Sequence, residues 1–436
     1  MRVLVYVRKW NKEFYINLAK SLGNDIEVVT ISDFYGIGDI WTGTYIYDCK
    51  LDFVNKKFEV LQEDIITRCR FLRSIDKKKS KILANRFWNG LEKEFKKGID
   101  IVLMAAIDCY TMDIIERLAN IYKSEYFSLV TSFINGYSRF TKRGELFRAN
   151  REVSDSEVKE VLRILLNNNY KPSFLLYKNK VFVDNFKFFI KRKVIENICY
   201  PVFKLKDKDN YHYNTLYFYK KKYKEYSSKK AEKFYQKIKE QNINIDKSVY
   251  IPLHFSPEAT VDYWSDDFNL ANYEESIINF ISKSDEEIIF FIKEHPMMYG
   301  RRNIKFYYKL SSFKNVKIIH PYENSNELLN KVNNILVYTG SVGIEALIRN
   351  KRVFTLTTNY YSDLHSNIFK ISKLNKLDLH REIRKYENEI FIKNLLSGMF
   401  KGYSTSGYNI NDSNFNSIKN ELIRILKNKN KFEDKK

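Results

Sequence analysis

The stretch IIFFIKEHP, residues 288–296, and the stretch ILVYTGSVGIEAL, residues 335–347, decide the fold of this chain. Each begins as an apolar run of strand length and stops at a polar turn, the first at a histidine and the second at a glycine-rich loop that opens a helix. In an open parallel sheet, ligands bind at the edge formed by the carboxyl ends of the strands. The two stretches therefore predict a site for a phosphorylated ligand at one edge of a sheet.

Strands and helices alternate around these two stretches. The expected strands are 249–253, 288–293, 316–319, 335–338 and 353–356, and the expected helices are 273–281, 304–310, 326–332 and 342–348. Five short apolar strands that alternate with helices are typical of a parallel, doubly wound α/β sheet with right-handed crossovers.

The N-terminal half reads as a second β/α region with insertions. Its expected strands are 3–7, 26–31, 99–106 and 126–131, and its expected helices are 12–22, 112–122 and 154–166, the last opened by a Ser154-Asp155-Ser156-Glu157 capping box. Residues 204–246 are dense in Lys and Tyr, with helical spacing from 227 to 241 and no strand, which indicates a connecting helix. We expect domains at 1–245 and 246–375, and a C-terminal helical segment at 376–436 that could pack back on the first domain.

Length and composition set the broad class. A chain of 436 residues with 44% hydrophobic residues can bury a large core, and its length favours two domains. No run approaches the ~18 to 20 apolar residues needed to cross a bilayer, and the first strand follows Met1 without a signal-peptide pattern, so we expect a cytoplasmic protein. Cys49, Cys69, Cys109 and Cys199 are dispersed, which argues against a disulfide framework and a zinc site.

The formal net charge of +22 has two explanations, and both stay open. Lysine can simply supply the solvated surface, or the chain can have an anionic partner. The basic clusters at 77–79, 220–222 and 427–436 are interrupted by acids or aromatics and match no RNA-binding signature, so specific nucleic-acid binding is disfavoured. Peripheral contact with an anionic inner membrane leaflet fits better, because each Lys or Arg near such a surface adds ~1 kcal/mol.

The loop Thr339-Gly340-Ser341-Val342-Gly343 is the first candidate for anion binding. It enters a helix whose first amides lack partners, and such an end favours an anion. Ser341 could add a hydroxyl, while Gly340 and Gly343 would let the backbone approach an oxygen. The alternative is an ordinary turn with Ser341 as the helix cap. The loop matches neither a Walker motif nor the full GxGxxG spacing. Glu345 could reach a ribose, or simply stabilise the positive helix end.

Two His-Pro pairs end strands. His295 could donate to a phosphate leaving group, because imidazole titrates near neutral pH, although a histidine at a strand end can also be structural. His320 ranks lower, since residues 322–329 read as an ordinary capped helix start. Glu258 and Asp262 lie in the loop after the 249–253 strand, where a carboxylate could act as base or nucleophile or merely be solvated.

Taken in order, the segments LHFSPEAT (253–260), KEHP (293–296) and TGSVGIEAL (339–347) resemble bacterial capsule and surface-polysaccharide glycosyltransferases of the GT-B type. The resemblance covers residues 250–357. It is greatest to the group that includes Kdo transferases, and more distant to bacterial sialyltransferases and CDP-glycerol polymer transferases. Those relatives share a Lys-x-His-Pro motif and a serine-bearing loop that hold the phosphate of a cytidine nucleotide.

The resemblance implies a fold and a set of roles. GT-B enzymes have two Rossmann-like domains facing a cleft, with the donor in the C-terminal domain and the acceptor against the N-terminal one. The residues implied to hold the donor phosphate are Lys293, His295, Thr339, Gly340, Ser341, Val342 and Gly343. Glu345 would bind ribose. Glu258 would be the catalytic carboxylate, with Asp262 as its rival, because the glutamine- and acid-rich loop of Kdo transferases is here His254-Phe255-Ser256-Pro257-Glu258.

The first half would then contact the acceptor. Asp108, at the end of the 99–106 strand, is the candidate acceptor base, and its alternative role is a helix cap. Arg139 and His254 could bind an anionic acceptor or an ulosonate carboxylate.

The resemblance thus predicts a glycosyltransferase, without a cofactor, that moves an ulosonate such as Kdo or a sialic-acid-like sugar from a CMP-activated donor to a capsule or lipopolysaccharide glycan. Asp266-Asp267 is the only pair of adjacent aspartates and no DxD-like pair stands convincingly at a strand end, so metal-independent transfer is expected. Three alternatives remain: a CDP-glycerol-type glycerophosphotransferase, a UDP-sugar epimerase, and a basic nucleic-acid-binding protein.

Overall fold

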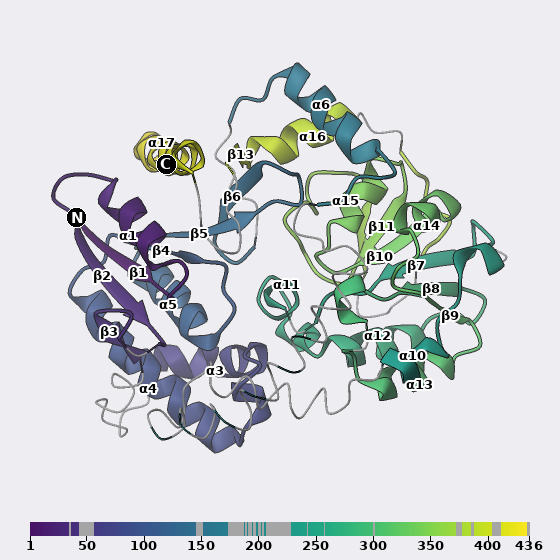
Figure 1. Ribbon diagram of the computed structural model, residues 1–436, viewed down its shortest axis with the longest axis horizontal. Coiled ribbons are helices and arrows are strands. Elements are labelled where there is room, and N and C mark those ends of the chain that lie inside the picture. Colours follow the sequence, from purple (N-terminus) through teal and green to yellow (C-terminus); the bar gives the residue numbers. More distant parts are fainter. Residues whose placement is uncertain are drawn as a thin grey trace. The chain divides into compact units, whose positions relative to one another are not determined.

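The computed structural model describes residues 1–34, 36–42, 56–144, 151–172, 228–241, 243–256, 258–299, 301–371, 377–384, 388–402 and 411–433, with single positions between 187 and 205. Outside the sparsely described stretch 173–227, the chain forms two compact units. The first comprises residues 1–153 and 395–436, and the second comprises 154–172 and 228–394. Each unit is built on one largely parallel sheet with helices on both faces (Figure 1), so the predicted α/β fold with two Rossmann-like domains is confirmed. The domain bounds 1–245, 246–375 and 376–436 remain predictions.

The sheet of the second unit has six parallel strands in the order β12-β11-β10-β7-β8-β9. Their bounds are β7 (Ser248–Pro252), β8 (Ile289–Lys293), β9 (Val316–Ile319), β10 (Asn334–Val337), β11 (Arg352–Thr355) and β12 (Ile368–Lys370). The five expected strands each lie within one residue of these bounds, and the short β12 was missed. The strand order reverses between β7 and β10, and such a reversal marks the crevice where ligands bind in open α/β sheets.

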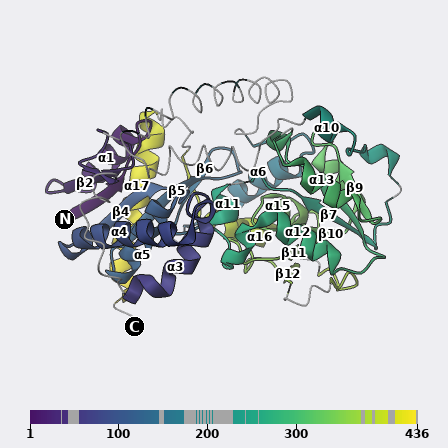
Figure 2. The same ribbon diagram turned by 90° about the horizontal axis from the view of Figure 1, so that it is seen from below.

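Helices cover both faces of this sheet. The helices of this unit are α6 (Asp155–Leu166), α10 (Ser228–Glu232), α11 (Ala259–Asp262), α12 (Tyr273–Ser282), α13 (Ile304–Ser311), α14 (Ser325–Lys331) and α15 (Val342–Leu347), and α16 (Asn388–Ser397) begins in this unit and ends in the first. Alternate residues of β7 and β8, among them Ile251 and Ile292, pack against α12 and α13 in one buried cluster. Figure 2 shows α13 beside β9 and α10. The predicted cap of α6 is present, with Ser154 accepting from the Glu157 amide at 3.3 Å.

The expected helix over 227–241 is wrong beyond residue 232. α10 stops at Glu232, Gln236 then forms a parallel bridge with Ile319, and a 3₁₀ turn covers Ile238–Glu240. Tertiary contacts override the helical spacing here, because the Gln236 amide donates to the Ile318 carbonyl at 2.8 Å. Much of the expected connecting segment 204–246, including the basic cluster 220–222, lies outside the described residues, as do Cys49 and Cys199.

The sheet of the first unit runs in the order β13-β6-β5-β4-β1-β2-β3. Its strands are β1 (Arg2–Tyr6), β2 (Glu27–Ser32), β3 (Ile40–Trp41), β4 (Ile101–Ala105), β5 (Glu125–Thr131), β6 (Tyr137–Thr141) and β13 (Phe400–Lys401), and only the β5–β6 and β6–β13 pairings are antiparallel. Its helices are α1 (Lys12–Lys20), α3 (Lys56–Arg68), α4 (Lys77–Lys96), α5 (Tyr110–Ile121) and α17 (Asp412–Glu433). Figure 1 shows α1 and α17 on one side of this sheet and α3, α4 and α5 on the other.

The C-terminal helix α17 completes the core of the first unit. Ile418 and Leu422 of α17 are fully buried in one apolar cluster with Leu18 of α1 and with Val3 and Val5 of β1. This helix therefore covers strands that lie some 400 residues earlier in the sequence.

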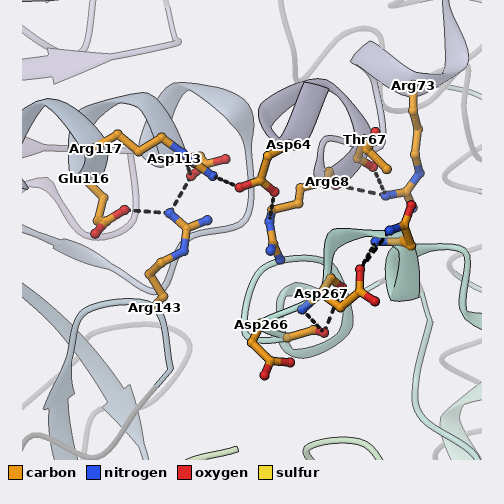
Figure 3. A network of polar contacts seen from close by, with 12 residues as sticks. Asp64, Thr67, Arg68, Arg73, Asp113, Glu116, Arg117, Arg143, Asp266 and Asp267 are labelled. Carbon is orange, nitrogen blue, oxygen red and sulfur yellow. Dashed lines mark hydrogen bonds and ion pairs between the residues drawn. The ribbon is translucent and has the colours of Figure 1, made fainter. Parts of the chain in front are cut away.

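A network of ion pairs stabilises the other side of the first unit (Figure 3). Asp113 of α5 is fully buried and accepts from Arg117 at 2.9 Å and from Arg143 at 2.7 Å. Arg117 also donates to Asp64 of α3 at 2.6 Å. The two arginines hold the pKa of Asp113 at about 2 although burial alone would raise it. The network thus joins α3, α5 and the segment after β6.

None of the described helices combines the length and the apolar character needed to span a membrane.

Candidate functional site

Three strand-end loops of the second unit meet at the point where the strand order reverses. The Leu253 amide donates to the Lys293 carbonyl at 2.9 Å, which extends the pairing of β7 and β8 into the loops. The Thr339 amide, after β10, points at Nε2 of His254, after β7, at 3.4 Å. Thr339 Oγ1 also donates to the Thr260 carbonyl at 3.2 Å. The motifs after β7, β8 and β10 are therefore side by side at the carboxyl edge of the sheet.

His295 follows β8 and presents one nitrogen for a ligand. Its Nδ1 accepts from the Met297 amide at 3.2 Å, so in the neutral imidazole the proton lies on Nε2. Burial, followed by the electrostatic effects of Lys293, His254 and Arg302, lowers the pKa of His295 to about 3. The free protein therefore offers a neutral Nε2–H donor at this position.

His254 lies between the loops after β7 and β10. Its Nε2 accepts from Thr339, so its own proton is assigned to Nδ1, and its backbone amide donates to the Tyr273 hydroxyl at 3.0 Å. Burial, with Arg302 as a further cause, lowers the pKa of His254 to about 4. His254 is thus a neutral group that holds the glycine-rich loop.

The glycines of the 339–343 loop have a packing role that the sequence did not predict. A Cβ at Gly343 would lie 2.2 Å from the hydroxyl oxygen of Tyr361, and a Cβ at Gly340 would lie 3.3 Å from the His254 ring. The Tyr361 hydroxyl donates to the Gly340 carbonyl at 2.7 Å. Glycine is therefore needed at Gly343 to admit a buried tyrosine that fixes the loop.

Ser341 occupies the N-cap position of α15, but its hydroxyl makes no hydrogen bond to the first turn of the helix. The helix starts at Val342 without a side-chain hydrogen bond at its N-cap, and Ser341 has a helical backbone conformation. Side-chain caps need an extended backbone at the cap residue. The Ser341 hydroxyl, which is partly exposed, thus remains available at the start of the helix.

A buried ion pair lies beneath both histidine loops. Glu294 and Arg302 are both 0% exposed, and the Arg302 Nε donates to Glu294 Oε2 at 2.6 Å. Glu294 also accepts from the His295 amide at 2.7 Å and from the Tyr307 hydroxyl at 2.6 Å. Arg302 Nη2 donates to the His254 carbonyl at 2.8 Å. This pair was missed in the sequence, where the one available signal was a glutamate directly after an apolar strand.

Lys293 and His320 serve other contacts than those expected for a phosphate ligand. The Lys293 ammonium is buried and donates to the Pro321 carbonyl at 2.9 Å, and burial lowers its pKa to about 8. His320 Nε2 lies 3.3 Å from Glu232 Oε1, and its ring packs among Tyr235, Tyr299 and Tyr322. Lys293 therefore ties β8 to the loop after β9.

The candidate carboxylates differ in exposure. Glu258 is partly exposed and accepts from the Thr260 hydroxyl at 2.7 Å at the start of α11. Asp262, on the same helix, is 1% exposed. Pro257 lies outside the described residues. Burial raises the pKa of Glu345, on α15, to about 7 against the opposing effect of Arg349.

The acidic pair Asp266-Asp267 has structural partners. Asp266 accepts from Thr357, Thr358 and Lys370 at 2.6 to 2.7 Å, and these contacts lower its pKa. Asp267 caps the Phe268–Ala271 turn by accepting from the Asn269 amide. Within the described part of the chain, no three His, Cys, Asp or Glu side chains gather in a way that could hold a metal ion.

Two of the candidate acceptor residues, Asp108 and Arg139, lie in the first unit. Asp108 follows β4 and forms a two-pronged ion pair with Arg8, which follows β1, at 2.6 and 2.7 Å. β1 and β4 flank the reversal of strand order in this sheet, so Asp108 also occupies a switch point. It does not cap α5, whose N-cap is Cys109. Arg139, by contrast, is 2% exposed and donates to the Gly144 carbonyl at 2.5 Å, a structural contact.

One family model agrees with the motifs. Residues 181–365 match the family model described as "Capsule polysaccharide biosynthesis protein". A comparison with curated proteins finds no match. Among solved structures, the chain is similar to Thermosulfurimonas dismutans KpsC, beta Kdo 2,4 transferase, at 11% identity over 75% of this chain and 88% of that chain, with a TM-score of 0.40.

Two further solved structures show similar scores. KpsC, beta Kdo 2,7 transferase, from the same organism is 13% identical over 98% of this chain and 100% of that chain, with a TM-score of 0.37. The UDP-GlcNAc 2-epimerase of Methanocaldococcus jannaschii in complex with UDP-GlcNAc and UDP is 16% identical over 98% of this chain and 99% of that chain, with a TM-score of 0.28. Residues 181–365, which include β7 to β11 and the loops that follow β7, β8 and β10, thus carry the capsule polysaccharide biosynthesis family match that the motifs predicted.

Proposed function

We propose that this chain is a glycosyltransferase of capsule polysaccharide synthesis, which moves a sugar from a nucleotide-activated donor to a glycan acceptor. One observation carries the proposal: the family match covers strands β7 to β11 of the sheet whose switch point brings His295, His254 and the Ser341 loop together. A phosphate bound there would meet neutral donors at the place where open α/β sheets bind their ligands.

The donor phosphate would be held by His295 and Ser341. The His295 Nε2–H and the Ser341 hydroxyl can each donate to a phosphate oxygen, and hydrogen bonds to an ionised acceptor are about twice as strong as neutral ones. Because both donors are in place before the sugar bond breaks, they would stabilise the charge that develops on the leaving phosphate. His295 would act as a hydrogen-bond donor, since its lowered pKa leaves it uncharged in the free protein.

The remaining roles follow from exposure and position. Glu258 is the preferred catalytic carboxylate over Asp262, because a partly exposed side chain can reach a substrate and a 1% exposed one cannot. Glu345 is proposed to bind the ribose. Asp108, held by Arg8, is proposed as the base for the acceptor hydroxyl.

The motif resemblance supports a CMP-activated ulosonate as the donor, and a capsule or lipopolysaccharide glycan as the acceptor. The net charge of +22 supports peripheral contact with the anionic inner face of the cell membrane.

A donor screen tests the function. The protein is incubated with CMP-, CDP-, UDP- and GDP-activated compounds, and the release of nucleotide is measured with and without oligosaccharide acceptors. CMP release from CMP-Kdo or a CMP-sialic-acid-like donor is expected, and it should fall at least tenfold in His295→Ala and in Ser341→Ala. Turnover of CDP-glycerol would instead indicate a glycerophosphotransferase, and isomerised UDP-sugar without an acceptor would indicate an epimerase. Steeply salt-dependent nucleic-acid binding that survives His295→Ala, without turnover of any donor, would instead indicate the nonenzymatic nucleic-acid-binding alternative.

A further inference from the structure

We propose that Arg302 is a positioning residue that sets the two histidine loops of the phosphate site against each other. It would do so by fixing one loop directly and the other through Glu294. The inference rests on the proposed function only for the identity of the ligand, since the contacts themselves lie within the second unit.

Arg302 is bonded directly to the main chain of the His254 loop and, through the Glu294 carboxylate, to that of the His295 loop. Its Nη2 donates to the His254 carbonyl at 2.8 Å, and its Nε and Nη2 donate to the two oxygens of Glu294 at 2.6 and 3.0 Å. Glu294 Oε1 in turn accepts from the His295 amide at 2.7 Å. A planar guanidinium presents its donors in a fixed fork, so these bonds define the separation of the two loops.

The energetic setting argues against a purely stabilising role. Both members of the pair are 0% exposed, so each charge has lost its hydration. Burying an ion pair in this way often contributes no more stability than apolar residues of the same volume, whereas removing one partner leaves an uncompensated charge. What apolar residues could not supply is the set of directed bonds to the His254 carbonyl and the His295 amide.

The histidines show what the pair would control. Each imidazole has a nitrogen that accepts from a backbone amide, at Met297 for His295 and at Thr339 for His254. A shift of either loop would break these contacts and change which nitrogen carries the proton. Arg302 would therefore act on the ligand through the imidazoles, without touching it.

A double variant separates positioning from stability. Glu294→Leu combined with Arg302→Met removes both charges at similar volume, so it should fold with a melting temperature close to the parent. Tyr307 keeps a hydroxyl partner in Tyr235 at 3.0 Å. We expect release of nucleotide from the donor to fall at least tenfold in this variant. Arg302→Lys keeps the charge but loses the fork of donors, so its rate of nucleotide release should lie between those of the parent and the double variant.

The matched control is Glu274→Gln. Glu274 contacts Arg302 only through Nη1, at 3.3 Å, and Nη1 reaches neither histidine loop. This variant should leave turnover unchanged, within twofold of the parent.

Imidazole titration by NMR gives a readout that does not need turnover. The charged groups around the two rings are Lys293, Glu294, Arg302 and Glu274. The double variant removes one negative charge, at Glu294, and one positive charge, at Arg302. In the parent, neither His254 nor His295 should titrate between pH 5 and 8. In the double variant both should titrate within that range, because displaced loops expose the rings to water.

The outcomes are decisive in either direction. Loss of turnover together with titration of both rings, at an unchanged melting temperature, supports positioning. The inference would be overturned by a double variant with parental turnover in which neither His254 nor His295 titrates between pH 5 and 8. If the double variant does not fold, Arg302→Lys is titrated instead, and parental behaviour there would also overturn the inference. If the parent turns over none of the donors, the proposed function fails, while the titrations still decide the role of Arg302.

Discussion

Acid should weaken this protein through histidines that the fold keeps uncharged, and His295→Gln isolates one of them. Burial, followed by the electrostatic effects of Lys293, His254 and Arg302, lowers the pKa of His295 from 6.5 to about 3. At pH 5 the folded state therefore holds this imidazole neutral, while the unfolded chain binds a proton. Because the unfolded state binds more protons, the free energy of unfolding must fall as the pH falls from about 6.5 towards 3.

The magnitude follows from the two pKa values. Between an unfolded pKa of 6.5 and pH 5 lie about 1.5 units, and each unit corresponds to ~1.36 kcal/mol, so His295 should cost about 2 kcal/mol of stability at pH 5. The result does not depend on the depth of the shift, because pH 5 lies well above the folded pKa. Relative to that of His295→Gln, the free energy of unfolding of the parent should thus be about 2 kcal/mol lower at pH 5 than at pH 7.

Urea unfolding at 25 °C and at both pH values measures this difference. His380→Gln is the control, because it replaces an exposed histidine. The difference in free energy of unfolding between this variant and the parent should be the same at both pH values. If the difference in free energy of unfolding between the parent and His295→Gln is the same at both pH values, the folded imidazole is charged or freely hydrated at pH 5. It would then be no neutral donor, and the assignment of its proton to Nε2 would be refuted.

Three further predictions concern both units. Asp113→Asn should lower the free energy of unfolding at pH 7 by about 2.5 kcal/mol, because folding lowers the pKa of Asp113 from 3.8 to about 2. This stabilisation is present above pH 4 and is lost as the pH drops towards 2. Urea unfolding of the variant checks it. Gly343→Ala should lower the melting temperature by several degrees, since its Cβ would meet the Tyr361 hydroxyl, whereas Gly23→Ala, whose nearest neighbour atom would be 3.5 Å away, should not. Asp108→Asn should stop transfer to acceptor while donor hydrolysis continues, and equal loss of both would rule out an acceptor base.

Much of the second unit could be predicted from its sequence, because its strands are short apolar runs bounded by polar turns. The stretch 288–293 has no competing helical period, and β8 covers Ile289–Lys293. The same runs end at residues that the sheet must bring to one edge, which is why His295 and the 339–343 loop could be placed together. The first unit was harder, because α4 spans 20 residues with charged positions on its buried face, such as Glu92 and Glu94.

The site could be predicted only as far as neighbours along the chain determine it. The role of Arg302 depends on Glu294 and on the His254 carbonyl, and no local spacing signals either contact. Gly343 was expected to make room for a phosphate oxygen, whereas Tyr361, eighteen residues later, is what its missing Cβ admits. Lys293 likewise turns to the Pro321 carbonyl, a partner supplied by the loop after β9.

Binding of CMP, measured by isothermal titration calorimetry on the parent, His295→Ala and Ser341→Ala, tests the central claim most directly. Each variant removes one donor to the phosphate, and a hydrogen bond to a charged group is worth about 1.5 to 3 kcal/mol, so the dissociation constant should rise roughly tenfold to a hundredfold in each. If all three proteins bind CMP equally well, the phosphate does not lie between His295 and the Ser341 loop, and the site is wrong.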